Sequence, residues 1–474
     1  MLRPHPIHLA VLCATGLFAA AAEAQITYRS TSGSFDFGAG IDAVPDINGD
    51  GVPDLVIATP GASPQGIQRA GVVGYYSGLD GAPLGEVRGT RTFASIGHEI
   101  CVLPDVDGDG WADFAFSEDG AVGISASVHV HSGRSLALIR THAVASLRVA
   151  SLEPSPDVDG DGIGDYLVGA LDGSVSHRGR VRLFSGATGA VLLNLNHLTN
   201  DASFGWRVAA LGDVNGDGTG DIAVTSSSFS STSPSVTAAG RVEVISGSTG
   251  QALWARTGTS IGEQVGLSMR AMADLDGDGV MDLIVTSVTE LFAVSGRTGT
   301  VIYTRPLVAV PNLTSHGYEN DLEVLGDVDF DGVPELLVHS RTYELGNELM
   351  TLAVSALVLR GASGETLAAL PNPGRFDLPF RAGGWHGGAD FDGDGRADLI
   401  AAVSGSRVEW IGFPLDAPVC AGLANSTGQP GAIDSRACSA RPRRRPCSSQ
   451  AGFPAARRPL PRSGHIRPSE PRRR

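Results

Sequence analysis

The most chemically distinctive residues of this 474-residue chain are aspartates crowded into short glycine-containing stretches. The stretch DVDGDGWAD, residues 105–113, carries four aspartates and two glycines in nine residues. Oxygen atoms at positions 1, 3 and 5, the backbone carbonyl at position 7 and a carboxylate at position 9 could surround one cation. Calcium takes six to eight oxygen ligands at about 2.3–2.6 Å, and this spacing is similar to the start of an EF-hand loop. The stretch therefore predicts a calcium-binding turn.

The same pattern occurs seven times, at intervals of 59, 52, 56, 61, 53 and 63 residues. Position 7 offers only its carbonyl, so its side chain is free to vary, and it does vary between copies. We expect up to one calcium ion per repeat. The predicted ligands are Asp46, Asn48, Asp50, Val52 and Asp54; Asp105, Asp107, Asp109, Trp111 and Asp113; Asp157, Asp159, Asp161, Ile163 and Asp165; Asp213, Asn215, Asp217, Thr219 and Asp221; Asp274, Asp276, Asp278, Val280 and Asp282; Asp327, Asp329, Asp331, Val333 and Glu335; and Asp390, Asp392, Asp394, Arg396 and Asp398.

A simpler interpretation is a set of aspartate-rich turns without metal, because Asp and Gly favour turns in any case. Charge argues against it. The seven stretches hold 26 of the 51 acidic residues, which would repel one another without a cation. The sixth stretch fits the pattern least well, because Phe330 replaces a glycine and Glu335 replaces the last aspartate.

Each acidic stretch lies between short runs that read as strands. A buried run such as FAFS follows it, and then an alternating run that ends in a turn such as SGATG. About four strands per repeat predict an all-β fold, a seven-bladed β-propeller of four-stranded blades with a calcium-binding turn in each blade. The last repeat lacks a fourth strand, and we expect residues 25–31 to complete it and close the ring.

The ends of the chain differ from this body. Residues 1–24 have the charged start, apolar run and small-residue cleavage site of a secretory signal peptide, and about 14 apolar residues are too few for a membrane anchor. We therefore expect a propeller over 25–416, secreted to the extracellular space or cell surface, with no transmembrane segment in the mature chain. Between Asp54 and Asp398 the sequence contains one cysteine, Cys101, so disulfides are not expected to staple the propeller.

Residues 417–474 begin as a small module and continue as an arginine- and proline-rich tail. Residues 436–474 carry 12 arginines and one acid. The tail could be a disordered end, a basic arm for an acidic polymer, or the product of reading a GC-rich gene out of frame. We favour disorder with the last origin. The chain as a whole is acidic, with a net charge of −16, and we expect no nucleic-acid partner.

Enzymatic chemistry has little support in the sequence. The histidines are scattered over different repeats without a nucleophile motif beside them, and the glycines belong to turns and not to a phosphate-binding loop. We expect no enzyme. A propeller can still assemble a site from several blades, so a calcium-dependent polysaccharide-active enzyme of the lyase type, or a lectin, stays open as the alternative.

The repeats resemble the FG-GAP repeats of integrin α-subunit propellers and their bacterial secreted relatives. FDFG (35–38) and SFGW (203–206) match the first half of that motif, and ATPGAS (58–63) comes nearest to the second. The acidic turn and the FSGATG hairpin (184–189) match best, and the resemblance covers about residues 25–416. It implies a metal-binding, cell-adhesion type of module for a protein or glycan ligand.

In the resembling family, ligands bind at the face opposite the metal turns. Here that face would be built from hairpin loops and links between blades, with residues that the chain exposes on them. The expected loops are 60–71, 117–125, 172–179, 226–240 and 339–348, the links 196–205 and 313–320, and the candidate residues Arg69, His177, Arg178, Arg341 and Tyr343.

Overall fold

The computed structural model divides the chain into two compact units, residues 1–415 and 416–474. The expected signal peptide and the whole second unit lie outside the described residues. The structure describes residues 26–29, 36–121, 124–144, 146, 148–172, 178–196, 203–232, 234–307, 316–344, 350–370, 385–387, 389–391, 397–404 and 407–411.

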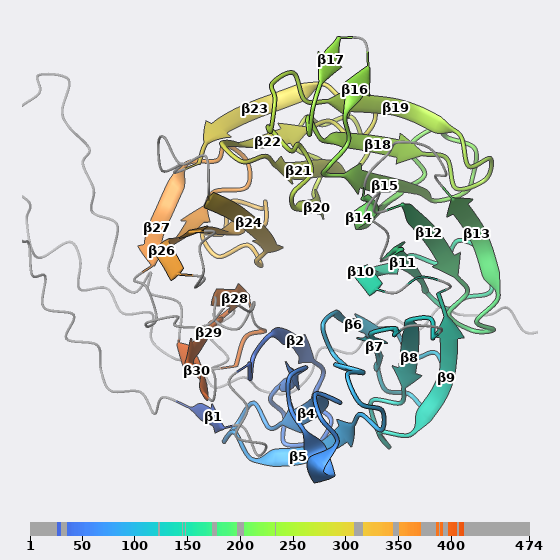
Figure 1. Cartoon of the computed structure of the whole chain (residues 1–474), viewed down its shortest axis with the longest axis vertical. Coiled ribbons are helices and arrows are strands. Elements are labelled where there is room, and N and C mark those ends of the chain that lie inside the picture. Colours follow the sequence, from blue (N-terminus) through green and yellow to red (C-terminus); the bar gives the residue numbers. More distant parts are fainter. Residues whose placement is uncertain are drawn as a thin grey trace, which may run out of the picture. The chain divides into compact units, whose positions relative to one another are not determined.

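Six four-stranded antiparallel sheets are each built from one continuous segment of the first unit. In every one, the strand order follows the chain from the central axis outward (Figure 1). The sheets are β2 (Gly40–Val44), β3 (Asp54–Thr59), β4 (Val72–Tyr76) and β5 (Pro83–Arg88); β6 (Ile100–Leu103), β7 (Asp113–Glu118), β8 (Ser127–His131) and β9 (Leu138–Ala143); β10 (Arg148–Ser155), β11 (Asp165–Leu171), β12 (Gly179–Phe184) and β13 (Val191–Asn196); β14 (Phe204–Gly212), β15 (Asp221–Ser226), β18 (Arg241–Ile245) and β19 (Ala252–Thr257); β20 (Met269–Met272), β21 (Asp282–Thr286), β22 (Glu290–Val294) and β23 (Val301–Pro306); and β24 (His316–Val324), β25 (Leu336–Glu344), β26 (Met350–Leu359) and β27 (Thr366–Leu370).

A further four-stranded sheet is composite, because it draws on both ends of the unit. It contains β28 (Trp385–Gly387), β29 (Leu399–Ser404), β30 (Arg407–Ile411) and the N-terminal strand β1 (Thr27–Arg29). Strand β1 pairs antiparallel with β30, with Tyr28 opposite Val408. The prediction that the N-terminal segment completes the last blade and closes the ring is therefore confirmed.

The core lies between the sheets, because each sheet buries both of its faces against its neighbours. Seven clusters of buried apolar residues occur in the described part of the unit, and each contains residues of two adjacent sheets. One cluster joins the two ends of the ring, with Tyr28 and Val408 packed beside Leu55, Ile57 and Tyr76. Ring closure thus removes an open sheet edge that could pair with other chains.

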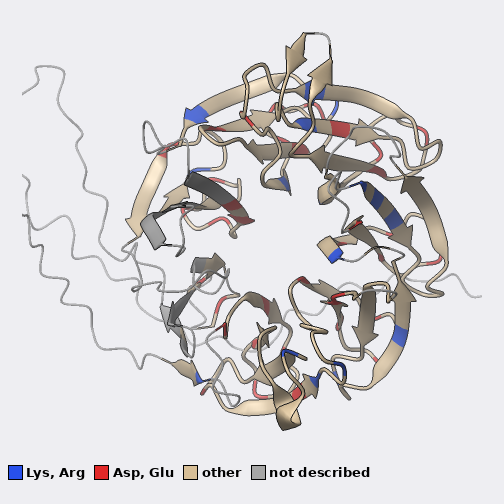
Figure 2. Ribbon diagram, in the orientation of Figure 1, with Lys and Arg blue, Asp and Glu red and all other residues tan. Residues whose placement is uncertain are grey.

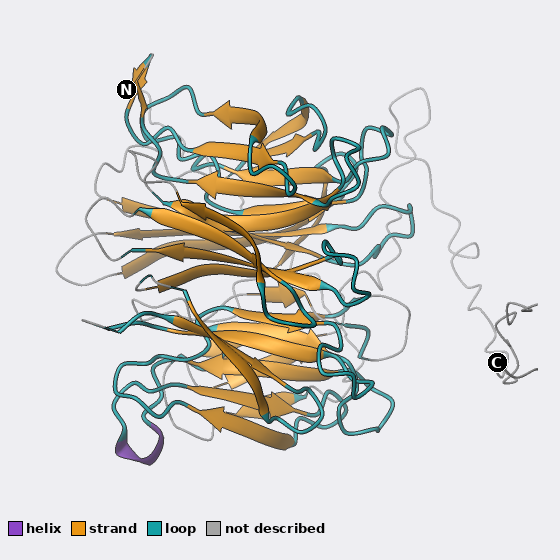
Figure 3. Cartoon of the chain, turned by 90° about the vertical axis from the view of Figure 1, so that its right-hand side faces the viewer, coloured by secondary structure: helices purple, strands orange, loops and turns teal. Residues whose placement is uncertain are grey.

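Strands and turns account for nearly all the regular structure of the described residues of the unit (Figure 3). The short 3-10 helix η1 (Pro64–Gly66) and a small hairpin of β16 (Ser231–Thr232) and β17 (Ser235–Val236) lie in loops between the second and third strands of their blades. Strand β25 continues through Glu344, so the expected loop at 339–348 is wrong for its first six residues. No helix among the described residues has the length and apolar character needed to cross a membrane.

Candidate metal centres in the acidic turns

The acidic stretches join the innermost strand of a sheet to the next strand, and they recur around the ring (Figure 2). In the first five blades, the ninth residue of the stretch is the first residue of the second strand. The glycines at positions 4 and 6 adopt positive φ, as at Gly160 (78°) and Gly162 (92°). Glycine adopts positive φ without steric cost. The backbone can therefore turn sharply enough for the oxygens of several side chains to point toward one centre.

Backbone amides hold the first, third and fifth side chains in place, as the third turn illustrates. Asp157 Oδ1 accepts the amides of Gly160 and Asp161, at 2.7 and 3.2 Å, and its Oδ2 accepts the Gly162 amide at 2.7 Å. Asp159 Oδ1 accepts the Asp161 amide at 3.3 Å. The loop thereby pre-orders its carboxylates, a feature that reduces the ordering cost of binding a cation.

The ninth carboxylate connects the acidic turn to the neighbouring hairpin. Asp165 is fully buried; its Oδ2 accepts the Val158 amide at 2.8 Å and its Oδ1 accepts the Gly186 amide at 2.9 Å. Gly186 lies so close to the acidic turn that a Cβ on it would be 1.9 Å from the Gly164 carbonyl oxygen. The serine before that glycine also contacts the turn, because Ser185 Oγ donates to the Asp161 carboxylate at 3.4 Å. The acidic turn and the serine–glycine turn therefore form one unit at the same end of the blade.

The second bond of the ninth carboxylate recurs in the first five blades. In each, a glycine amide in the turn between the third and fourth strands, here called the second hairpin, donates to Oδ1 at 2.9–3.1 Å. The pairs are Gly78 with Asp54, Gly133 with Asp113, Gly186 with Asp165, Gly247 with Asp221, and Gly296 with Asp282.

The arrangement fits a calcium ion in geometry and in donor chemistry. In four turns, one oxygen from each of three or four acidic residues lies within 4.8 Å of the others. Two oxygens that bind one calcium ion at about 2.3–2.6 Å lie at most about 5 Å apart, so such a group can share an ion. The four groups are Asp105, Asp107 and Asp113; Asp157, Asp159 and Asp165; Asp274, Asp276 and Asp282; and Asp327, Asp329, Asp331 and Glu335.

The first and fourth turns replace the third-position aspartate with asparagine. Asn48 Oδ1 accepts the amide of Asp50, and its Nδ2 donates to the Asp50 carboxylate at 2.8 Å. Asn215 makes the equivalent pair of bonds to Asp217, with the second at 3.0 Å. The amide oxygen keeps its place in the turn, so these two turns have the same scaffold with one less negative charge.

The exposed and the buried carboxylates of the turns differ in the direction of their pKa shifts. Amide hydrogen bonds, first of all from Gly162, lower the pKa of Asp157, and the same cause lowers that of Asp274. Burial raises the pKa of the ninth carboxylate, to about 6 at Asp113 and to about 7 at Glu335. A buried carboxylate with nearby acids is costly when ionised, and a bound cation would offset that cost.

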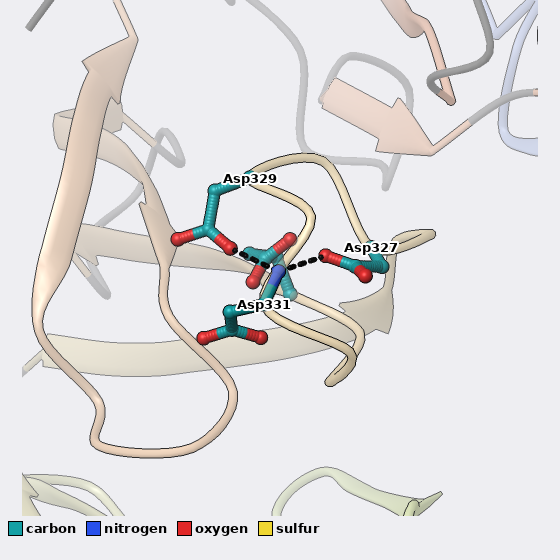
Figure 4. A group of neighbouring side chains, drawn as sticks. Asp327, Asp329 and Asp331 are labelled. Atoms are coloured by element: carbon teal, nitrogen blue, oxygen red, sulfur yellow. Dashed lines mark hydrogen bonds between the residues drawn. The ribbon is translucent and has the colours of Figure 1, made fainter.

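The sixth turn brings its acidic side chains together in a different environment (Figure 4). Asp331 donates its amide to Asp327 and Asp329, at 3.1 and 3.2 Å, as in the other turns. Glu335 Oε2 accepts the Val328 amide at 2.6 Å, but its buried Oε1 has no hydrogen-bond partner in the structure. The longer glutamate thus misses the second bond that the ninth aspartate makes in the first five blades.

The seventh turn is described only at its ends. Asp398 is buried and accepts the Phe391 amide at 2.8 Å, as the ninth residue does in the other turns. Asp390 lies before Phe391 on the described side of the turn. The predicted ligands Asp392, Asp394 and Arg396 lie outside the described residues.

The loops at the other end of the blades are described in part. Arg69 is half-buried, which corrects the expectation that it is exposed, and Arg178 is exposed. His177 and the side chains of Arg341 and Tyr343 lie outside the description. The sequence reasoning missed Phe93 and Ile261, which are 49% and 80% exposed on the links that follow the first and fourth blades. The available signal was the tripeptide SIG, a weaker form of the FG motif, which follows Phe93 at residues 95–97 and contains Ile261 at residues 260–262.

Comparison with known proteins supports the same family. A family model of the FG-GAP repeat matches residues 37–76 and 204–245, which contain the first and fourth acidic turns. Integrin alpha-V from Gallus gallus is 26% identical over 224 residues, which cover 42% of this chain and 21% of that protein. Integrin alpha-4 from Xenopus laevis is 29% identical over 150 residues, which cover 28% of this chain and 14% of that protein. The matches thus span about a fifth or less of these relatives.

A solved structure with the same fold is the crystal structure of BBS1N in complex with ARL6DN. It superposes with a TM-score of 0.51 at 12% identity, over 82% of this chain and 98% of that chain, a likeness that concerns the fold alone. The matched repeats, the integrin similarity and the ring of four-stranded sheets agree with one another. The chain contains FG-GAP repeats at residues 37–76 and 204–245, and part of its β-propeller is similar in sequence to integrin α chains.

Proposed function

We propose that this chain is a secreted, calcium-stabilised propeller that serves as a binding or adhesion module for an extracellular protein or glycan. The observation that carries the calcium part is the convergence of acidic oxygens within 4.8 Å in the second, third and fifth turns. Backbone amides pre-order these carboxylates, and the ninth residue ties each turn of the first five blades to a second hairpin. A bound ion would therefore stabilise two loops of a blade at once.

The binding part rests on the loops at the end away from the acidic turns. The loop 60–71 is fastened to the link 93–96, where the amides of Phe93, Ser95 and Ile96 donate to carbonyls of the loop at 2.9–3.1 Å. The fourth blade repeats this arrangement with the loop 226–240 and the link 262–265. Because these loops are held in a fixed conformation, they can present exposed side chains at low ordering cost.

The exposed apolar residues on these links give the proposal a specific surface. Phe93 and Ile261 each expose about half or more of their area on equivalent links. An exposed apolar side chain on an ordered loop is a suitable anchor in a binding interface. The similarity to integrin α chains supports the same assignment.

Chelation tests the calcium part. Removal of an ion held at 100 times its dissociation constant costs about 2.7 kcal/mol per site, and several turns should contribute. We expect the melting temperature to fall by about 10 °C or more when EDTA is added, and to recover with excess calcium. An unchanged melting curve would contradict the calcium assignment.

Ligand screening tests the binding part. The propeller, in calcium, is applied to arrays of extracellular proteins and glycans, beside a double variant F93S/I261S and a control L138S on outer strand β9. Leu138 is also exposed, at 54%. We expect a ligand whose signal the double variant loses and the control keeps. Polysaccharides are assayed in parallel for new reducing or unsaturated ends, and the appearance of such ends would instead favour the lyase-type enzyme.

A further inference from the structure

The turn between the third and fourth strands of the sixth blade differs from those of the first five blades at the residue that faces the acidic turn. In the first five blades this residue is a serine: Ser77, Ser132, Ser185, Ser246 and Ser295. In the sixth blade it is Arg360, followed by Gly361 at the same close approach to the turn, where a Cβ would lie 2.0 Å from the Pro334 carbonyl oxygen. The backbone framework is thus kept while a neutral hydroxyl is exchanged for a cation.

The Arg360 guanidinium lies on the acidic turn. Its Nε and Nη2 both donate to Asp329 Oδ2, at 2.9 and 2.7 Å, and its Nε lies 3.6 Å from Asp331 Oδ2. A third contact holds the other side of the guanidinium, because Nη1 donates to Glu365 at 3.2 Å. Two charge-assisted bonds to one carboxylate oxygen are strong and directional.

These contacts occupy the Asp329 oxygen that accepts no backbone amide of the turn. Asp329 is the third-position residue, and its Oδ1 already accepts the Asp331 amide. Arg360 takes Oδ2. In the first four blades, the serine hydroxyl donates at 3.2–3.4 Å to the fifth-position aspartate and not to the third. A calcium ion in the sixth turn would have to displace the guanidinium and also overcome the repulsion of its charge.

The fifth turn shows that an arginine alone does not produce this arrangement. Arg297 Nε lies 3.3 Å from the Asp278 carboxylate and the side chain is 49% exposed, so it contacts the rim of the turn. Its contacts are with the fifth-position residue, and Asp276 and Asp282 still converge with Asp274. Arg360 differs because it replaces the serine next to the close-approach glycine and reaches the third position.

We propose that Arg360 serves as a built-in cation of the sixth acidic turn, so that this turn is closed by a guanidinium and does not hold calcium. Four carboxylates lie together there, which requires positive charge for stability, and the side chain supplies it from within the chain. The proposal rests on the calcium function proposed above for the other turns. It makes the acidic turn of the sixth blade independent of calcium.

The test counts calcium ions per chain by native mass spectrometry and by titration calorimetry. The full chain is compared with R360S, which restores the serine of the first five blades, and with R297S as the matched control. We expect R360S to bind one ion more than the parent, and R297S to bind the same number. R360Q keeps the length of the side chain without its charge and serves if R360S does not fold; it should also gain an ion.

A further variant approaches the same question from the turn itself. D329N should leave the ion count of the parent unchanged, because the sixth turn holds no ion to lose. A parent that binds calcium, together with an R360S and an R360Q that bind no more, would overturn the Arg360 proposal alone, as would a D329N that loses an ion. A parent that binds no calcium at all would overturn the function proposed above.

Discussion

The third and sixth acidic turns are built on the same backbone plan and differ in how they balance their charge. Each holds four acidic residues, and each is approached by a glycine of the next hairpin at 1.9 or 2.0 Å for an added Cβ. In the third turn Asp165 accepts amides from both loops, whereas Glu335 of the sixth makes one such bond. Arg360 supplies a cation in the sixth turn. A repeat can thus keep its geometry while exchanging the source of its positive charge.

The largest expected difference between the two turns is in the free energy of unfolding that is lost when the ninth residue is replaced by alanine. D165A leaves the part-buried amide of Val158 and the buried amide of Gly186 without an acceptor, at about 1–3 kcal/mol each. E335A removes one such hydrogen bond, that of the Val328 amide. We expect urea unfolding in calcium to show a loss of about 4 kcal/mol for D165A and about 2 kcal/mol for E335A. Equal losses would show that the second bond does not distinguish the two turns.

The close-approach glycines test what the two turns share. In G186A and G361A the new methyl group would overlap a carbonyl oxygen of the acidic turn, so the hairpins must separate. Overpacking of this kind costs about 1–3 kcal/mol, and we expect about 2–3 kcal/mol for both variants in thermal unfolding. A tolerated G361A beside a damaging G186A would mean that the sixth turn does not share the backbone plan.

The contrast between paired and unpaired carboxylates also occurs on the inner strands. On β24, the Glu323 carboxylate lies 2.7 Å from His386. Burial alone would raise the pKa of Glu323, but the nearby histidine opposes this effect, and the pKa is lowered. On β2, Asp42 accepts the Val102 amide at 3.2 Å, and burial raises its pKa to about 7, with Glu323 and Glu153 adding to the effect. Asp42 therefore resembles a turn carboxylate without a cation.

This difference has a pH signature. The folded-state pKa of Asp42 is above the unfolded value of about 3.9, so the native state binds more protons between these values and stability falls as pH rises from about 4 to 7. Because Asp42 is partly exposed, we expect about 1 kcal/mol from this residue. D42N should remove that part of the slope in urea unfolding at pH 5 and pH 7. An unchanged slope would contradict the raised pKa.

The smallest expected effect comes from Phe330, which occupies the glycine position of the sixth turn with φ of 62° and 62% exposure. Left-handed φ costs a non-glycine residue about 1–2 kcal/mol, and the added freedom of glycine in the unfolded chain offsets part of it. F330G should therefore raise stability by about 0.5 kcal/mol in urea unfolding. A destabilised F330G would show that the aromatic ring contributes a contact that outweighs the strain.

Much of this molecule followed from its sequence because it is repetitive. Seven copies of one acidic pattern, each followed by the same strand and turn signals, predicted an all-β propeller of four-stranded blades and the segment that joins its ends. Single loops were less predictable. The 339–348 segment continues β25 to Glu344, and Arg69 is half-buried, because contacts with other segments decide both.

Residue types and their spacing were enough to predict which side chains can share a cation, because they define what a nine-residue turn can present. It also marked the sixth copy as unusual, through Phe330 and Glu335. The source of the positive charge that balances the acidic side chains of that copy became visible only in the folded chain. Arg360 lies about 30 residues from the turn, and no local pattern connects the two; the sheet brings its guanidinium to within 2.7 Å of Asp329. Local spacing defines a ligand set, whereas the charge that meets it depends on what the fold places beside it.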